Sequence, residues 1–162
     1  MPTIPWDSPL VKESLGHAVG GFMRDSGPWD WWLTLTFAGQ LTAGRALDIL
    51  RCWTKALARG LHHHVKLAWV LDGNGGRWHV HALLGLPDGV AISSVELDRS
   101  WRATVAGLTG FTRIRAYDRS QGGAPFYLGK KTDYFDWSIS VACPRRPQCR
   151  RRKGCVASKF AW

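Results

Sequence analysis

Residues 77–84 constrain the fold more than any other stretch, because their polar and apolar side chains alternate with a period of two. Successive side chains of a β-strand point to opposite faces, so His79 and His81 share one face while Trp78 and Val80 share the other. The pattern therefore predicts a strand with one face in a core and two imidazoles on the other face. Two such imidazoles can bind one divalent cation, since imidazole is the commonest metal-ligating side chain. A pair of polar surface histidines fits the spacing equally well.

The size and charge of the chain restrict its class. A length of 162 residues predicts one domain with a real core, and no apolar run approaches the roughly 20 residues of a membrane span. A net charge of +10 favours a polyanionic partner, with nucleic acid ahead of an anionic membrane. Some of the ten Trp must be core residues, and others can stack on unpaired bases. The start of the chain lacks the pattern of a signal peptide, so we expect a cytoplasmic protein with its four Cys reduced.

Other segments show regular periodicity. Alternation predicts further strands over residues 31–37, 65–72, 111–117 and 135–141. Helical periodicity predicts helices over residues 42–59, 93–107 and 125–134, and a short helix that begins at Ser8-Pro9. Gly60 is expected to follow the end of the first of these helices, Ser93 and Glu96 form a capping-box pattern, and residues 73–76 are expected to be a turn.

The order strand, helix, strand, strand, helix, strand predicts an α+β fold, specifically a ferredoxin-like βαββαβ antiparallel sheet. We expect its first and third strands to be central neighbours, two helices on one face, and the helix of residues 125–134 on the other. The bulky residues expected under the two helices are Leu33, Leu35, Leu67, Trp69, Val80 and Ile114. The polar residues expected to share the opposite, open face are Thr34, Thr36, Asp72, His79, His81, Arg113 and Arg115. This domain is expected over residues 29–141, between an N-terminal extension (1–28) and a basic, Cys-containing tail (142–162).

Asp72 is the natural third ligand on that face. Two imidazoles and one carboxylate leave open positions on a cation, as metal-assisted phosphate chemistry requires. The alternative for Asp72 is a hydrogen bond within the turn at the end of a hairpin.

Tyr127 and Lys130 lie three residues apart in the helix predicted over residues 125–134, and therefore share one helical face. A phenol with an ordinary pKa of about 10 is a poor nucleophile unless a cation or a polarised target assists it. The pair is thus either a nucleophile with its helper or an ordinary pair of surface residues.

Three short motifs now stand in order: residues 32–37, His79-Val80-His81, and Tyr127-x-x-Lys130. In these motifs the chain resembles the HUH endonucleases, specifically the single-tyrosine rolling-circle replication initiator (Rep) proteins of plasmids and phages. The resemblance extends over residues 31–134.

The resemblance implies that His79 and His81 hold Mg²⁺ or Mn²⁺ and that Asp72, where relatives often carry Glu, completes the site. Tyr127 would attack a phosphodiester of single-stranded DNA, giving a 5′-phosphotyrosine and a free 3′-OH that primes synthesis, and Lys130 would orient the phosphate. Many relatives have a second Tyr directly after the motif Lys, where this chain has Lys131. Tyr134 would lie about 10 Å along the helix from Tyr127, so one tyrosine is expected to act.

The residues expected to contact DNA are Thr34, Thr36, Arg77, Arg113, Arg115 and Lys131. The expected partners are single-stranded DNA, an origin hairpin, and a host or partner helicase and polymerase, because the chain has no helicase segment. No membrane and no small-molecule cofactor are expected.

Other interpretations remain open. A transposase or relaxase would use the same chemistry. A non-catalytic RNA- or single-stranded-DNA-binding module shares the ferredoxin-like plan but places aromatic residues on its central strands, where only Trp32 is aromatic here. His62 and His64 also alternate, but they are expected to be solvated junction residues.

The tail contains three cysteines among many basic residues, at positions 143, 149 and 155. Zinc would need a fourth ligand, for which Cys52 is the candidate. A disordered basic arm that contacts phosphates is the preferred interpretation.

Overall fold

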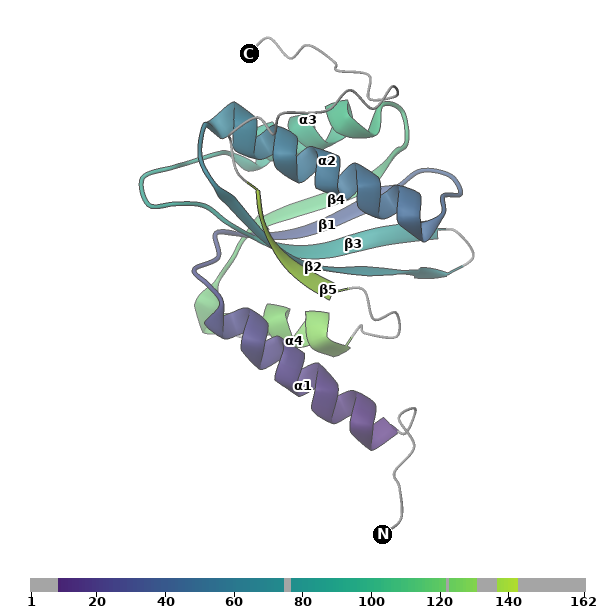
Figure 1. The fold of residues 1–162 in the computed structure, drawn as a ribbon, viewed down its shortest axis with the longest axis vertical. Coiled ribbons are helices and arrows are strands. Elements are labelled where there is room, and N and C mark those ends of the chain that lie inside the picture. The colour runs from purple at the N-terminus through teal and green to yellow at the C-terminus, as the bar shows by residue number, and fades with distance from the viewer. Residues whose placement is uncertain (1–8, 75–76, 122, 131–136, 143–162) are drawn as a thin grey trace, which may run out of the picture.

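An antiparallel sheet forms the centre of the molecule in the computed structural model, which describes residues 9–74, 77–121, 123–130 and 137–142 (Figure 1). Within these residues five strands are hydrogen-bonded in the order β4-β1-β3-β2-β5. The strands are β1 (Trp31–Phe37), β2 (Val65–Asn74), β3 (Arg77–Gly85), β4 (Thr109–Ala116) and β5 (Trp137–Ala142). The helices are α1 (Pro9–Asp25), α2 (Ala43–Leu61), α3 (Ser94–Val105) and α4 (Gly123–Lys130), with a 3₁₀ turn η1 (Arg119–Gln121).

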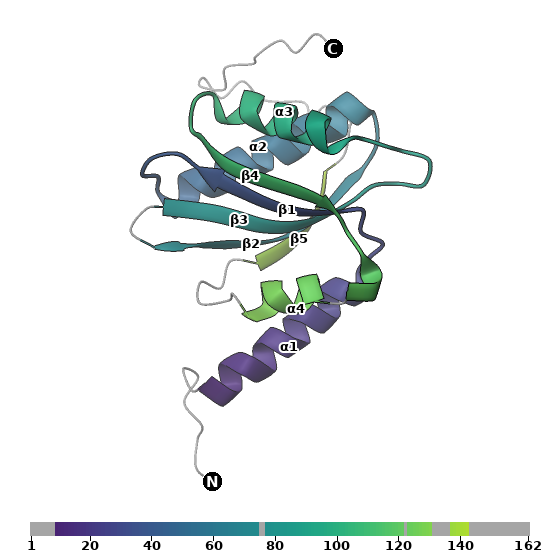
Figure 2. The same cartoon turned by 180° about the vertical axis from the view of Figure 1, so that it is seen from behind.

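The helices lie in two layers, one on each face of the sheet. Helices α2 and α3 cover one face, and α1 and α4 lie side by side on the other, as Figures 1 and 2 show from opposite directions. The fold is therefore α+β with an antiparallel sheet, as the order of sequence patterns predicted. The expectation that the first and third strands are neighbours is confirmed, because β1 pairs with β3 from Trp31↔Leu84 to Thr36↔His79.

The larger core lies between the sheet and helices α2 and α3. The bulky strand residues predicted for this side are buried there, and Ile114 is partly buried against them. From α2 the core receives Leu50 and Trp53, and from α3 it receives Trp101, whose ring packs edge-on against Trp53. The alternation of the strands thus predicted the faces correctly.

The opposite face is less open than predicted. Ala68 and Val70 of β2 and Leu83 of β3 are buried there with Val19, Met23 and Leu128 in a second, smaller core. Helix α1 has 17 residues, and it reaches this core together with α4. The sequence indicated only a short helix in this region, so the covering of the sheet by α1 was missed.

Several predicted boundaries were wrong, among them the starts of β4 and α4, each of which begins two residues earlier than predicted. Two other differences have a clear local cause. Helix α2 continues through Gly60 and ends at His62, which adopts the left-handed conformation and donates its backbone N–H to Ala58 and Arg59. Strand β2 continues through Gly73 to Asn74, which pairs with Arg77, so the predicted four-residue turn begins later. Glycine suits position 73 in this pairing because its φ is 151° and because it has no Cβ, which here would overlap the backbone of Arg77. The capping box of Ser93 and Glu96 is confirmed at the start of α3.

Within the described residues, the structure contains no helix that is both long and apolar enough to cross a membrane. The cysteines of the tail lie outside the described residues, and Cys52 is an exposed residue of α2.

Helices α1 and α4 are held together at a glycine. A Cβ on Gly20 would lie 2.8 Å from Phe126 Cα and 3.0 Å from the carbonyl oxygen of Pro125, closer than side chains normally approach a backbone. A Cβ on the neighbouring Gly21 would meet nothing within 4 Å. Arg24 lies over the ring of Phe126 on the same side of α1. Gly20 therefore sets how closely α4 approaches α1.

We predict opposite effects for two alanine substitutions one residue apart. Gly20→Ala should destabilise the protein by about 1–2 kcal/mol, because overpacking against the α4 backbone outweighs the gain in helix propensity. Gly21→Ala should stabilise it by about 0.5–1 kcal/mol, because it gains propensity without a clash. Urea unfolding followed by circular dichroism measures both changes, and equal midpoints for the two variants would contradict this packing.

Candidate metal centre

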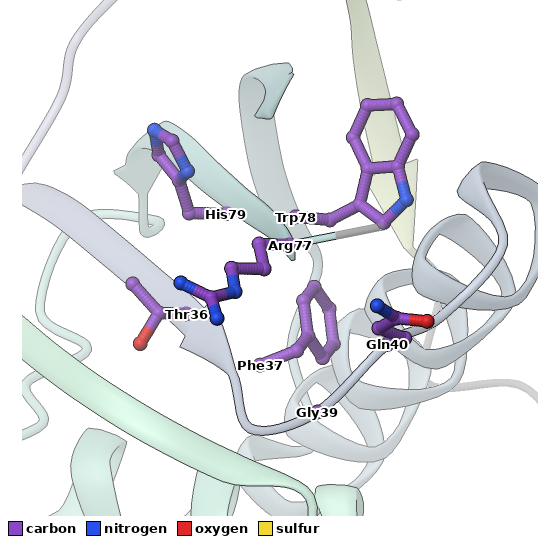
Figure 3. Close-up of a pocket in the computed structure, with 7 residues that line it drawn as sticks. All are labelled: Thr36, Phe37, Gly39, Gln40, Arg77, Trp78 and His79. Carbon is purple, nitrogen blue, oxygen red and sulfur yellow. The ribbon is translucent and has the colours of Figure 1, made fainter. Parts of the chain in front are cut away.

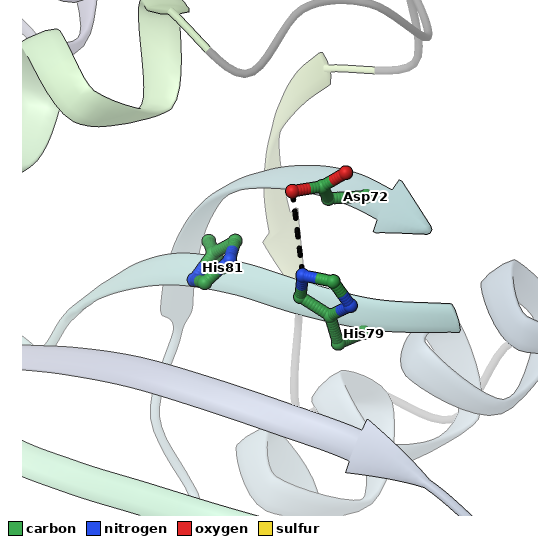
Figure 4. Close-up of side chains that lie close together, drawn as sticks. All are labelled: Asp72, His79 and His81. Carbon is green, nitrogen blue, oxygen red and sulfur yellow. Dashed lines mark ion pairs between the residues drawn. The ribbon is translucent and has the colours of Figure 1, made fainter. Parts of the chain in front are cut away.

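Three ligand-type side chains converge where β1, β3 and β2 lie next to one another. Asp72 pairs with His79 across β2 and β3, and His79 and His81 pair with Thr36 and Thr34 of β1. The Oδ2 atom of Asp72 lies 3.3 Å from Nε2 of His79 (Figure 4). One ligand atom from each of Asp72, His79 and His81 lies within 4.8 Å of the other two. The side chains predicted from the alternation are thus brought together, with Asp72 as the predicted third member.

The spacing fits a divalent cation. Two oxygen or nitrogen atoms bound to one small cation at about 2.1 Å stand at most about 4.2 Å apart. Atoms that already lie within 4.8 Å need only side-chain movements of less than an ångström to meet that limit. Two imidazoles and one carboxylate are a donor set that binds divalent transition metals, including Mn²⁺, and leaves positions open for a substrate. These three residues could therefore hold one such ion.

His81 is the most firmly positioned member of the group. Its residue is 7% exposed, and its ring stacks on Trp32 at 6.0 Å and meets the ring of His79 edge-on at 4.9 Å. Its Nδ1 atom lies 3.3 Å from the hydroxyl oxygen of Thr34. When Nδ1 carries the proton and donates it to Thr34, Nε2 is the ring atom that can act as a metal ligand. Thr34, predicted as a DNA contact, thus has a structural partner in His81.

Tyr127 lies beside this group although it comes from another layer of the molecule. Helix α4 places its ring 5.1 Å from the ring of His81 and 5.8 Å from that of Trp32, edge-on to both. The residue remains 41% exposed. The ring of Tyr127 therefore lies next to the candidate ligand His81, and the residue is accessible from solvent. The ring of Trp32 contacts both His81 and Tyr127, a role that the alternation of β1 did not predict although it placed Trp32 on this face.

The remaining predicted residues are only partly described. Lys130 is the last residue of α4, and Lys131 and Tyr134 lie outside the described residues. Arg113 and Arg115 of β4 are exposed, and they pair with Thr34 and Trp32 of β1. They consequently lie two strands away from His79 and His81, with β1 between them.

A pocket of about 440 Å³ opens beside His79 at the end of the sheet (Figure 3). It is lined by Thr36, Phe37, Gly39, Gln40, Arg77, Trp78 and His79. Arg77 and Thr36 were predicted to contact DNA, and both line this pocket. Gly39 and Gln40, which belong to the loop after β1, were not predicted.

The second histidine pair does not belong to the site. Residues 62–64 are exposed at the junction between α2 and β2, where His62 ends the helix, as expected for solvated junction residues. Among the described residues, Asp72, His79 and His81 are the one group of three side chains placed to hold a metal ion.

No protein-family model, curated protein or solved structure matches the chain.

We predict that full-length protein binds Mn²⁺ through this group. Asp72→Asn and His79→Ala should each weaken Mn²⁺ binding by more than about 100-fold, because each removes a direct ligand. Loss of a residue that only hydrogen-bonds to a ligand usually costs about 10- to 100-fold. Isothermal titration with MnCl₂ measures the affinity. His63→Ala is the matched control because it removes an exposed histidine outside the group. Equal affinities for all variants would place the ion elsewhere.

Thr34→Val tests the orientation of His81. Valine has nearly the same shape as threonine but cannot hydrogen-bond to Nδ1, so Mn²⁺ affinity should fall by about 10-fold while the fold is retained. The same titration and a thermal melt separate these effects. An unchanged affinity would show that packing against Trp32 alone orients the ring.

Proposed function

We propose that this protein is a metal-dependent nickase and strand transferase of single-stranded DNA, of the HUH rolling-circle replication initiator type, with Tyr127 as its nucleophile. The observation that carries the proposal is the contact between the rings of Tyr127 and His81, 5.1 Å apart. A potential nucleophile on α4 lies against a potential metal ligand on β3. The net charge of +10 favours a polyanionic substrate.

The fold is compatible with the same proposal. We propose a ferredoxin-like βαββαβ core made of β1, α2, β2, β3, α3 and β4. The order β4-β1-β3-β2, with α2 and α3 on one face, supports this assignment. Strand β5 and helices α1 and α4 would then be additions to it, and α4 would supply the tyrosine.

The proposed reaction needs no group beyond the protein, the ion and the DNA. The hydroxyl oxygen of Tyr127 attacks phosphorus, an O–P bond to tyrosine forms, and the bond from phosphorus to the 3′ oxygen breaks. The phenol gives up its proton, and the departing 3′ oxygen takes up one to become a 3′-OH. Attack by a 3′-OH on the phosphotyrosine reverses these steps and joins two strands.

In this scheme the residues around the phosphate have separate roles. Asp72, His79 and His81 would hold Mg²⁺ or Mn²⁺, which when bound would polarise the scissile phosphate. Thr34 would orient His81 through Nδ1. Lys130, one helical turn after Tyr127, would orient the phosphate.

The proposed setting is a replication origin with an exposed single strand or hairpin, with a helicase and a polymerase supplied by other proteins. Transposition or mobilisation by the same chemistry is the alternative within the proposal. A non-catalytic binding module would need free aromatic faces on the central strands. The face of Trp32, the one aromatic candidate there, stacks on His81.

The proposal predicts a covalent protein–DNA adduct. Wild-type protein incubated with pooled single-stranded oligonucleotides and Mn²⁺ should give a band shift that survives denaturing electrophoresis. Tyr127→Phe should abolish the adduct because it removes the attacking oxygen, and His79→Ala should reduce it by at least about 100-fold because it removes a metal ligand.

Tyr117→Phe is the matched control, because Tyr117 packs against the same small core as α4 but is outside the candidate metal centre. It should react like wild type. An adduct that persists in Tyr127→Phe would show that another residue is the nucleophile, and Tyr134→Phe would be the next variant to make. Binding without an adduct under every condition would favour the non-catalytic module.

A further inference from the structure

We infer that the edge strand β4 is a track for single-stranded DNA, in which Phe111 is a platform for one unpaired base and Arg113 and Arg115 contact phosphates. The inference deepens the proposed function, on which it rests for the identity of the nucleic acid. It names the surface that would guide the substrate past the candidate metal centre.

The exposure of Phe111 is the first observation. Phe111 is 66% exposed, the largest fraction among the exposed large hydrophobic residues of the described chain. Burying such a ring would be favourable, and a folded chain of this size has cores in which it could be placed. A single exposed apolar side chain is ordinary on a protein surface, so it is the aromatic face of Phe111, next to the exposed Arg113 and Arg115 of the same strand, that favours a binding role.

The direction of the side chains is the second observation. Thr112 hydrogen-bonds to Asp98 of α3, and Ile114 packs against the larger core. The residues that alternate with them, Phe111, Arg113 and Arg115, consequently face the other side of the sheet. That side carries His79 and His81, and all three residues of the track are exposed there.

The contact between Asp98 and Thr112 also fixes this edge of the sheet to α3. Burial raises the pKa of Asp98, but hydrogen bonds from Arg102 and Thr112 outweigh this effect, and the pKa lies below its ordinary value. The carboxylate is therefore charged at neutral pH and holds Thr112 on the helix side.

A β-bulge positions Phe111 locally. The register between β1 and β4 shifts between Leu35 and Phe37, so that Gly110 and Phe111 together face Thr36. The hydroxyl of Thr36 donates to the carbonyl oxygen of Phe111, and a Cβ on Gly110 would overlap that hydroxyl. Bulges re-aim side chains and are frequent next to active sites. Here Thr36 of β1 lies between the bulge on β4 and His79, its partner on β3.

The chemistry of the track favours a single strand. An aromatic face can stack on a base only when that base is unpaired, and such stacking tolerates any sequence. Guanidinium groups that alternate along the same strand suit a backbone of phosphates. Arg113 lies opposite Thr34 and Arg115 opposite Trp32, so the track runs parallel to the row of His79 and His81, with β1 between them.

The test measures binding without chemistry. Fluorescence anisotropy of a labelled mixed-sequence single-stranded oligonucleotide is recorded with full-length Tyr127→Phe protein in EDTA, over a range of salt concentrations. Added Phe111→Ala should weaken binding about 10-fold without changing the salt dependence, because it removes stacking and no charge. Added Arg113→Gln should lower the slope of log affinity against log salt by about 0.7, because one phosphate contact is lost.

Matched controls come from α3, which lies on the other face of the sheet. Val95 is 64% exposed there, so Val95→Ala removes a comparably exposed apolar side chain, and Arg99→Gln removes an exposed charge. The first control should bind like the parent, and the second should leave the salt slope unchanged. Phe111→Trp should restore binding because it restores a stacking face. A duplex of the same sequence should bind equally to the Phe111→Ala variant and its parent.

Several results would overturn the inference. Phe111→Ala binding within twofold of its parent, or an equal loss in Val95→Ala, would remove the stacking role. Tighter binding of RNA of the same sequence would assign the track to RNA. A change of molar mass in light scattering on Phe111→Ala would assign Phe111 to contact between copies of the chain.

The outcome is separable from that of the adduct experiment. An adduct that forms normally in Phe111→Ala protein with unchanged affinity would refute the track and leave the proposed nickase in place. Loss of affinity in this variant, together with no adduct in wild type, would support the track and refute the proposed nucleophile.

Discussion

The pairing register of β3 is the constraint on which the rest of the structure depends. Strand β3 lies between β1 and β2, with continuous pairing on both sides. Because side chains alternate with a period of two, a slip of one residue would turn His79 and His81 into the larger core and expose Trp78 and Val80. The hydrophobic burial that forms the core therefore also fixes the imidazoles on the other face. The same register sets Asp72 opposite His79 and Thr34 opposite His81. The burial of apolar side chains that stabilises the fold therefore also assembles the candidate metal centre.

Helices α1 and α4, which cover the other face of the sheet, pack together although they are far apart in the sequence. Tyr127 reaches His81 because α4 packs on the sheet through Leu128 and also rests on α1, a helix that begins more than a hundred residues earlier in the chain. Phe126, the neighbour of Tyr127, packs against Gly20 of that helix. The position of the phenol thus depends on the N-terminal region, whereas the positions of the imidazoles do not.

Short sequence patterns predicted those features that depend on neighbouring residues, namely the faces of the strands and the start of a helix. The alternation of β1, β2, β3 and β4 predicted the faces of their residues, and the pairing of Ser93 with Glu96 predicted the start of α3. The end of α2 was not predictable in this way, because Gly60 is the usual residue for a left-handed cap but the chain turns at His62. The covering of the sheet by α1 and the bulge at Phe111 depend on contacts between distant segments. So does the stacking of Trp32 on His81, and no short window of sequence contains these partners.

The three residues of the candidate metal centre differ in how far solvent reaches them. The side chains of His79 and Asp72 are 32% and 22% exposed, while His81 is buried beneath the rings of Trp32 and Tyr127. An ion held by all three residues would therefore be open to solvent, and to a substrate, on the side of His79 and Asp72, and shielded on the side of His81.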